Sequence, residues 1–223
     1  MIKEISFVIE DLVSRIDNTI DGTWNNTTNK IETCNTKWAR PGKPISDIGN
    51  DYVIEEVETD EWLTILDQTG LSGTFYIQTP YFLGGTRIAA NREWTISTPK
   101  LASKTPIIWL LHDIDYKVFG RSNTKEWESA LRIFFLDETN VVNYYTKDHT
   151  QNVVQPMTKL AEEFIEIIEQ DRSFETLEEY EIKNFTRFGT EDAGGSFQNI
   201  LDANLSGVEL RLTLSKYKGN CCV

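Results

Sequence analysis

Residues 205–215 read Leu-Ser-Gly-Val-Glu-Leu-Arg-Leu-Thr-Leu-Ser, and this stretch carries the clearest structural signal in the chain. From Val208 to Leu214 an apolar residue stands at every second position, with polar or charged residues between. Successive side chains of a β-strand point to opposite faces of its sheet. The alternation therefore predicts a strand with one buried face and one face in water.

Two other segments show the spacing of amphipathic helices, and we predict a helix over each. In residues 156–170 the apolar side chains share one face, and Pro156 suits the first turn because its missing N–H has no partner there. Residues 3–17 repeat the pattern near the start of the chain. The two apolar stripes consist of Met157, Leu160, Ala161, Phe164, Ile167 and Ile168, and of Ile5, Val8, Ile9, Leu12, Val13 and Ile16.

The middle of the chain is rich in β-branched and aromatic residues, which favour strands. Alternating segments at 52–57, 62–66 and 74–79 predict three short strands. Residues 106–114 and 131–136 are nearly continuous apolar runs, which are typical of buried central strands.

Gly84 and Gly85 lie between two short segments, Tyr81–Leu83 and Arg87–Ala90. Adjacent glycines at such a place favour a tight hairpin turn. No Lys-Ser or Lys-Thr follows them, and no third glycine stands at dinucleotide spacing, so a phosphate-binding loop is the weaker interpretation. We therefore predict a hairpin here.

These elements predict an α+β fold, a mostly antiparallel β-sheet with two or three flanking helices. A length of 223 residues favours one domain over residues 1–223. Asn, Thr, Gly and Pro dominate residues 17–50, which we interpret as an extended loop insertion with a short hairpin. We expect residues 217–223 to form a flexible C-terminal tail.

The composition is acidic, with 35 Asp and Glu against 22 Lys and Arg and a net charge of −13. Such a balance argues against a duplex-binding protein, because phosphate contacts need clustered Lys and Arg. No apolar run reaches membrane-spanning length, and acidic residues near the start disfavour a secretory signal. Cys34, Cys221 and Cys222 form neither a disulfide framework nor a spaced metal pattern, so we expect them reduced in a cytosol.

The segment Leu111-His112-Asp113-Ile114-Asp115 is the most conspicuous candidate for chemistry. A histidine beside two carboxylates could hold a divalent metal or act as an acid–base pair, or it could simply end a strand. Alternation along a strand sends His112 to one side and Asp113 and Asp115 to the other, so we expect them to diverge. We therefore predict no catalytic, cofactor-binding or metal-binding residues.

Six tryptophans are the remaining unusual feature. Trp24 and Trp38 stand alone in the polar segment 17–50, where they could be exposed and anchor a partner, since aromatic residues dominate interface hot spots. The alternative is that they cover the edge of the core. Both interpretations stay open, and the two residues are candidates for an interface.

The last third of the chain resembles a known group of proteins. A helix that opens Val154-Gln155-Pro156-Met157, a polar connection, and the closing run from Asn199 to Leu210 follow one another in an order similar to that of virion proteins of Bacteroidetes phages. The likeness is to the ring, or neck connector, proteins of crAss-like phages, which resemble tail terminators. It extends over residues 104–216.

The resemblance implies a tail-terminator-like fold and a subunit of a homo-oligomeric ring of six or twelve copies. Such a ring would sit between portal and tail in the neck of the virion, contact other neck and tail proteins, and be assembled in the cytoplasm of the host bacterium. It implies no catalytic residues, no cofactor and no membrane. Packaged DNA would pass through without specific binding, and an acidic lumen would let it slide.

Two other functions remain as alternatives. A metal-dependent hydrolase would use His112, Asp113 and Asp115. A carbohydrate- or receptor-binding module would use exposed tryptophans, on which sugars stack.

Overall fold

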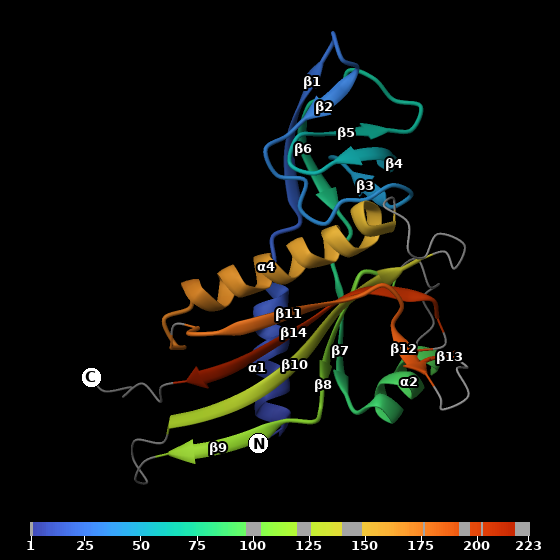
Figure 1. Cartoon of the computed structure of the whole chain (residues 1–223). Coiled ribbons are helices and arrows are strands. Elements are labelled where there is room, and N and C mark those ends of the chain that lie inside the picture. The colour runs from blue at the N-terminus through green and yellow to red at the C-terminus, as the bar shows by residue number, and fades with distance from the viewer. Residues whose placement is uncertain are drawn as a thin grey trace.

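The computed structural model describes residues 2–96, 104–119, 126–139, 149–175, 177–191, 197–201 and 203–216. Its described helices are α1 (Ile2–Ser14), α2 (Arg87–Ile96), a π-helical turn η3 (Thr150–Val154) and α4 (Gln155–Gln170). The strands form a closed barrel, a large sheet and a small hairpin. The predicted α+β class, with mostly antiparallel strands and a few flanking helices, is confirmed (Figure 1).

The barrel occupies the first third of the chain. Its strands follow the order β1-β2-β5-β4-β3-β6, and β6 pairs back to β1 to close it. Each strand sends one or two large apolar side chains inward, and together they fill the interior as in other small barrels. The strands are β1 (Thr19–Asn25), β2 (Lys30–Glu32), β3 (Pro44–Ser46), β4 (Asp51–Glu58), β5 (Trp62–Ile65) and β6 (Gly73–Ile77).

Residues 17–50 were expected to form a loop insertion, and this expectation is wrong in its main part. The segment supplies β1, β2 and β3, half of the barrel, although the short hairpin expected there is present as β1–β2. These strands escape recognition because each buries so little: Ile20, Ile31 and Ile45 are the inward apolar residues, and polar residues surround them.

The large sheet has the strand order β11-β14-β10-β8-β7, and β9 pairs with β10 beyond the end of β8. All pairs are antiparallel except β7 with β8. The terminal alternating segment is therefore a central strand, flanked on both sides. The bounds are β7 (Tyr81–Gly85), β8 (Ile107–Leu111), β9 (Asp115–Phe119), β10 (Glu126–Glu138), β11 (Tyr180–Phe185) and β14 (Leu205–Lys216), and the separate hairpin is β12 (Gly189–Glu191) with β13 (Phe197–Asn199).

The hairpin predicted at Gly84-Gly85 is wrong. Both glycines end strand β7, which runs parallel to β8, and the chain continues into helix α2 instead of a return strand. The glycines serve close packing here: a Cβ on Gly85 would lie 3.3 Å from the Cβ of Ala89, and one on Gly84 would lie 3.3 Å from Nε2 of His112. A pair of glycines thus marks a close approach as readily as a turn.

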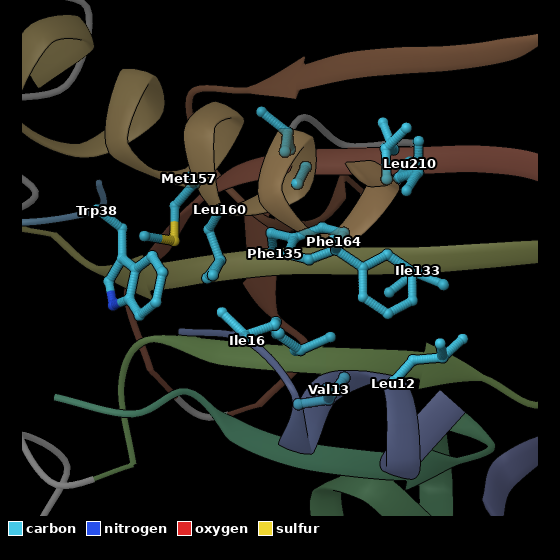
Figure 2. Close-up of a cluster of buried hydrophobic side chains, with 14 of the residues drawn as sticks. Leu12, Val13, Ile16, Trp38, Ile133, Phe135, Met157, Leu160, Phe164 and Leu210 are labelled. Atoms are coloured by element: carbon cyan, nitrogen blue, oxygen red, sulfur yellow. The ribbon is translucent and has the colours of Figure 1, made fainter. Parts of the chain in front are cut away.

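Both predicted helices, 3–17 and 156–170, are confirmed, and α1 and α4 pack on the same face of the sheet. In Figure 2, Leu12 and Val13 of α1 and Leu160 and Phe164 of α4 approach the β10 side chains from two sides. The Phe135 and Phe164 rings lie 5.8 Å apart. The interior of the barrel belongs to the same continuous apolar cluster, so barrel and sheet share one core.

The opposite face of the sheet is apolar at one end only. There Trp109 stacks on Phe134 at 5.3 Å, and Phe188 and Trp94 of α2 belong to the same buried cluster. The other end of this face carries polar and charged side chains of β9, β10, β11 and β14, and we call it the open sheet face. It includes Asp115, Lys117, Glu128, Arg132, Glu181, Lys183, Glu209 and Arg211.

Glu209 departs from the expectation that β14 keeps one face in water. Its side chain is fully buried, with Arg132 Nε 2.5 Å away and Arg211 Nη2 2.9 Å away. Burial by itself would raise the pKa of Glu209, but hydrogen bonds from Arg211 and Arg132 bring it below its usual value. The carboxylate is therefore charged and serves as the centre of an ion-pair network. The predicted C-terminal tail, 217–223, lies outside the described residues, as do Cys221 and Cys222.

Substitution of Gly207 tests the register of the two central strands. Gly207 has φ +153°, and a Cβ there would lie 2.0 Å from the backbone oxygen of Phe135 on β10. We expect Gly207→Ala to lower the free energy of unfolding by about 2–4 kcal/mol, measured by urea denaturation. Gly42→Ala is the control, because Gly42 also has positive φ but meets no atom within 4 Å, and it should cost only about 1 kcal/mol. Equal effects would contradict the tight packing of β14 on β10.

Asp171 offers a test by pH. The Ser173 hydroxyl, the Ser173 backbone N–H and Arg15, which follows α1, hydrogen-bond its carboxylate and lower its pKa to about 2. A folded pKa below the unfolded value of 3.8 gives stability that is complete above pH 3.8 and is lost as the pH falls toward 2. Asp171→Asn should therefore cost up to about 2 kcal/mol at pH 6. Denaturation curves of the two proteins should converge near pH 2, and a constant difference would contradict this account.

Candidate functional site

A hollow of about 500 Å³ lies between the barrel and the first turns of α4. Strand β4 forms one wall with Glu55, Glu56 and Glu58, and the segment that includes Lys37 and Arg40 forms another. We call this hollow the junction groove. Its lining contains no His, Ser or Cys, and its charged groups are three cations and three carboxylates.

The cations that line the junction groove are already engaged. Lys37 Nζ lies 2.8 Å from a carboxylate oxygen of Asp17, and Lys159 of α4 pairs with Asp60 of the barrel. Arg40 turns away from the groove toward the sheet, where its Nε lies 2.8 Å from Oδ2 of Asp137. These cations therefore fix the barrel to the rest of the molecule and leave the groove with the charge of its carboxylates.

Asp137 is the most deeply buried charged group at this junction, with 1% of its side chain exposed. It ends the apolar part of β10 and forms ion pairs with two barrel-segment cations, Arg40 and Lys43, the latter with Nζ 2.8 Å from Oδ1. Lys43 also donates to the Thr105 hydroxyl at 2.6 Å. Burial lowers the pKa of Lys43, while Asp137 opposes this shift. The ion-pair triad links barrel and sheet at one point.

The outer surface of the barrel is acidic. Residues 19–78 contain ten Asp and Glu against four Lys and Arg. Glu55, Glu56 and Glu58 of β4 are exposed, and none of them forms an ion pair with another described residue. We call these three residues the acidic wall. Exposed Glu162, Glu166 and Glu169 extend the negative charge along α4.

The open sheet face has a different character, because its charges are balanced. Lys117 lies 3.0 Å from Glu128, Arg211 bridges Glu209 and Glu181, and Arg132 completes the network. A shallow hollow of about 420 Å³ runs over this face, from Asp113 and Asp115 to the β11 edge. Paired charges on a flat strand surface suit a polar protein contact better than a catalytic cavity.

The structure separates His112 from its two acidic neighbours. The His112 ring lies 2.7 Å from the Ser6 hydroxyl of α1, while Asp113 and Asp115 are exposed beside the hollow on the open sheet face. Burial lowers the pKa of His112, so the imidazole is neutral at physiological pH. Throughout the described ranges, no three His, Cys, Asp or Glu side chains gather closely enough to hold a metal ion. His112, Asp113 and Asp115 therefore do not converge on one point, as the hydrolase alternative would require.

The two tryptophans proposed for an interface differ in their exposure. Trp38 is buried and donates its indole N–H to the backbone oxygen of Gln78 at 3.0 Å, so the exposed interpretation is wrong for it. Figure 2 shows Trp38 beside Met157 and Leu160 of α4. Trp24 is half-buried against the core and donates to Asn26. Trp62, also half-buried, carries the Lys30 ammonium over its ring at 3.1 Å.

Sequence reasoning missed the residues that organise these surfaces, namely Asp137, Arg40, Lys43 and Glu209. The apolar run 131–136 ends at Asp137, and the Arg40-Pro41-Gly42-Lys43 turn is basic, but nothing in the sequence pairs them. Glu209 stands at a position that alternation assigns to water. Only the strand order, which places Arg132 next to it on β10, explains its burial.

Comparison of the chain with protein-family models, with curated proteins and with solved structures finds no match. Among the helices that the structure describes, none is long and apolar enough to cross a membrane. Function has to be argued from the surfaces themselves.

Removal of Asp137 tests the triad. Asp137→Ala leaves Arg40 and Lys43 buried without their carboxylate, and the loss of one partner of a buried pair costs about 3–5 kcal/mol. Asp11→Ala is the control, because the Asp11–Arg15 pair is exposed on α1 and should be worth under about 1 kcal/mol. Chemical denaturation measures both. A cost for Asp137→Ala no larger than the control would show that the triad does not hold barrel and sheet together.

Proposed function

We propose that this protein is a structural subunit of a closed ring in the head–tail connector, or neck, of a phage particle. In this role it joins portal to tail and surrounds the DNA conduit, and it acts by fitting beside copies of itself. The observation that carries the proposal is the division of the surface: carboxylates without ion-pair partners gather on the acidic wall, while the open sheet face is balanced. The resemblance of residues 104–216 to neck ring proteins supplies the class.

The division of charge suits the two tasks of a conduit subunit. A surface that faces DNA in transit should not neutralise phosphates, because each neutralised phosphate adds affinity through counterion release. The acidic wall meets this requirement, and a ring multiplies its charge around the channel. A surface that faces a neighbouring subunit should instead match charge with charge. The open sheet face and the edges of its sheet meet that requirement.

The two alternatives have less support. The hydrolase needs His112, Asp113 and Asp115 together, and they point to different surroundings. A sugar-binding module needs an uncovered aromatic face, whereas Trp24 packs on the core and Lys30 covers the Trp62 ring. The described surfaces favour assembly over catalysis and over sugar binding.

The proposal predicts a ring that does not retain DNA. Electron microscopy and native mass spectrometry of the purified chain, alone and with the portal protein of the same phage, should show closed rings of six or twelve copies. Electrophoretic mobility assays at low salt should show no retention of duplex DNA by the unmodified ring. Substitution of Glu55, Glu56 and Glu58 by Lys should create salt-sensitive retention, because three charges change sign and the net charge of each copy rises by six units.

The control places the same substitution elsewhere: Glu162, Glu166 and Glu169 of α4 changed to Lys keep the composition and move the new charge away from the barrel. Retention that arises only from the barrel variant supports a wall that faces the conduit. A chain that stays monomeric and never joins portal or tail proteins would overturn the proposal, and so would turnover of a substrate by the purified protein.

A further inference from the structure

Among the described residues, three strands of the large sheet have an unpaired side: β7, which runs parallel to β8, and β9 and β11, which belong to its antiparallel part. In the part of the chain that the structure describes, β11 is paired only with β14, and β9 only with β10. Each therefore presents N–H and C=O groups on its outward side, which is the template that an added strand uses. Both edges are accessible, since Lys117, Val118, Tyr180 and Glu181 are exposed.

The directions of these strands allow the sheet to continue from one copy to the next. From β11 through β14 and β10 to β9, each strand is antiparallel to its neighbour. Edge β11 therefore runs opposite to edge β9. When β11 of one copy lies beside β9 of another, with the open sheet faces on the same side, the new pair is antiparallel like the rest of the sheet.

The charges on the two edges match in one register. On the open sheet face, β11 carries Glu181 and Lys183, and β9 carries Asp115 and Lys117. The antiparallel register that sets Glu181 opposite Lys117 also sets Lys183 opposite Asp115. A shift by two residues in one direction sets Lys183 against Lys117, and the opposite shift sets Glu181 against Asp115. Only one of the three registers joins opposite charges in both pairs, and directly opposed like charges destabilise a sheet.

The same register also joins two exposed apolar residues. Tyr180 of β11 falls opposite Val118 of β9, on the other face of the sheet, and each is 45% exposed in the single chain. Glu181 is already held by Arg211 at 3.3 Å, and Lys117 by Glu128 at 3.0 Å. The seam would therefore bring the pair Arg211–Glu181 beside the pair Lys117–Glu128, with alternating charge across it.

We propose that β11 of one copy pairs with β9 of a second copy in this register, with Glu181 opposite Lys117 and Tyr180 opposite Val118. The contact joins two different surfaces, so it is heterologous and generates a ring or an open chain. The inference rests on the proposed function for its setting, because it names the seam between neighbours in that ring. Lys on an edge strand usually prevents self-pairing. Here the facing carboxylate removes that protection for this one partner.

Disulfide cross-linking tests the register. In a background with Cys34, Cys221 and Cys222 changed to Ser, Tyr180→Cys and Val118→Cys are combined in one chain, reduced and then oxidised. Within one copy the two positions are three strand spacings apart, roughly 14 Å, which is too far for a disulfide. Cross-links must therefore join copies, and a non-reducing gel should show a ladder. The control combines Tyr180→Cys with Asp115→Cys, which lies on the opposite face, and should give no ladder.

A charge exchange tests the ion pair in the unmodified background. Glu181→Lys and Lys117→Glu should each weaken self-association about two- to fivefold in sedimentation experiments, and the double variant should recover most of the loss. Glu178→Lys is the matched control, because Glu178 is exposed just before β11 and makes the same change of charge off the edge. Its association should stay within about twofold of the unmodified chain.

The outcomes separate this seam from the proposed function. Rings that join the portal but give no ladder, or a ladder in the control too, overturn the seam and leave the ring. A specific ladder with open chains that never join portal or tail proteins supports the seam and overturns the neck function. A chain that stays monomeric without cross-links at every concentration overturns both.

Discussion

The ion-pair triad of Asp137 with Arg40 and Lys43 is the most deeply buried charged contact between the barrel segment and the sheet. The shared apolar core holds the two parts together, but apolar contacts are not directional. A buried carboxylate between two cations has few acceptable geometries, since any displacement leaves a charge unpaired in a low dielectric. The triad thus restricts, together with the Lys159–Asp60 pair, how the barrel and its acidic wall can be oriented relative to the sheet.

The sequence predicts best those elements whose burial is periodic and strong. The helices α1 and α4 and the strands β8, β10 and β14 each bury at least four apolar side chains, and their patterns were recognised. The barrel strands β1, β2 and β3 were not, because each buries so little and gains its stability from closure. Closure of the barrel depends on all six strands together, so no short segment of the sequence can reveal it. The hairpin prediction at the β7 glycines is wrong for a related reason. The close neighbour of Gly85 is Ala89 of helix α2, and the sequence does not show that this helix packs there.

The same distinction holds for the candidate site. Divergence of His112 from Asp113 and Asp115 follows from alternation alone and could be expected. The burial of Glu209 and Asp137 could not, because a single carboxylate in a polar or terminal position looks like any solvated one. These two carboxylates can be buried because arginine or lysine side chains from distant segments of the chain form ion pairs with them. The net charge likewise does not show where the charges lie. The value of −13 follows from the composition, whereas the gathering of exposed carboxylates on β4 and α4 follows from the fold.

The uneven distribution of charge resolves a conflict in the assembly of an acidic protein. Copies that each carry a net charge of −13 repel one another, and the repulsion acts over the distance between their acidic walls. At physiological salt, charges more than about 8 Å apart are largely screened, whereas opposed residues across a strand pair lie about 5 Å apart. Salt therefore removes the repulsion between walls sooner than the attraction between edges. In the proposed ring, a balanced seam together with an unbalanced wall would allow neighbours to associate while the surface that they enclose repels phosphate.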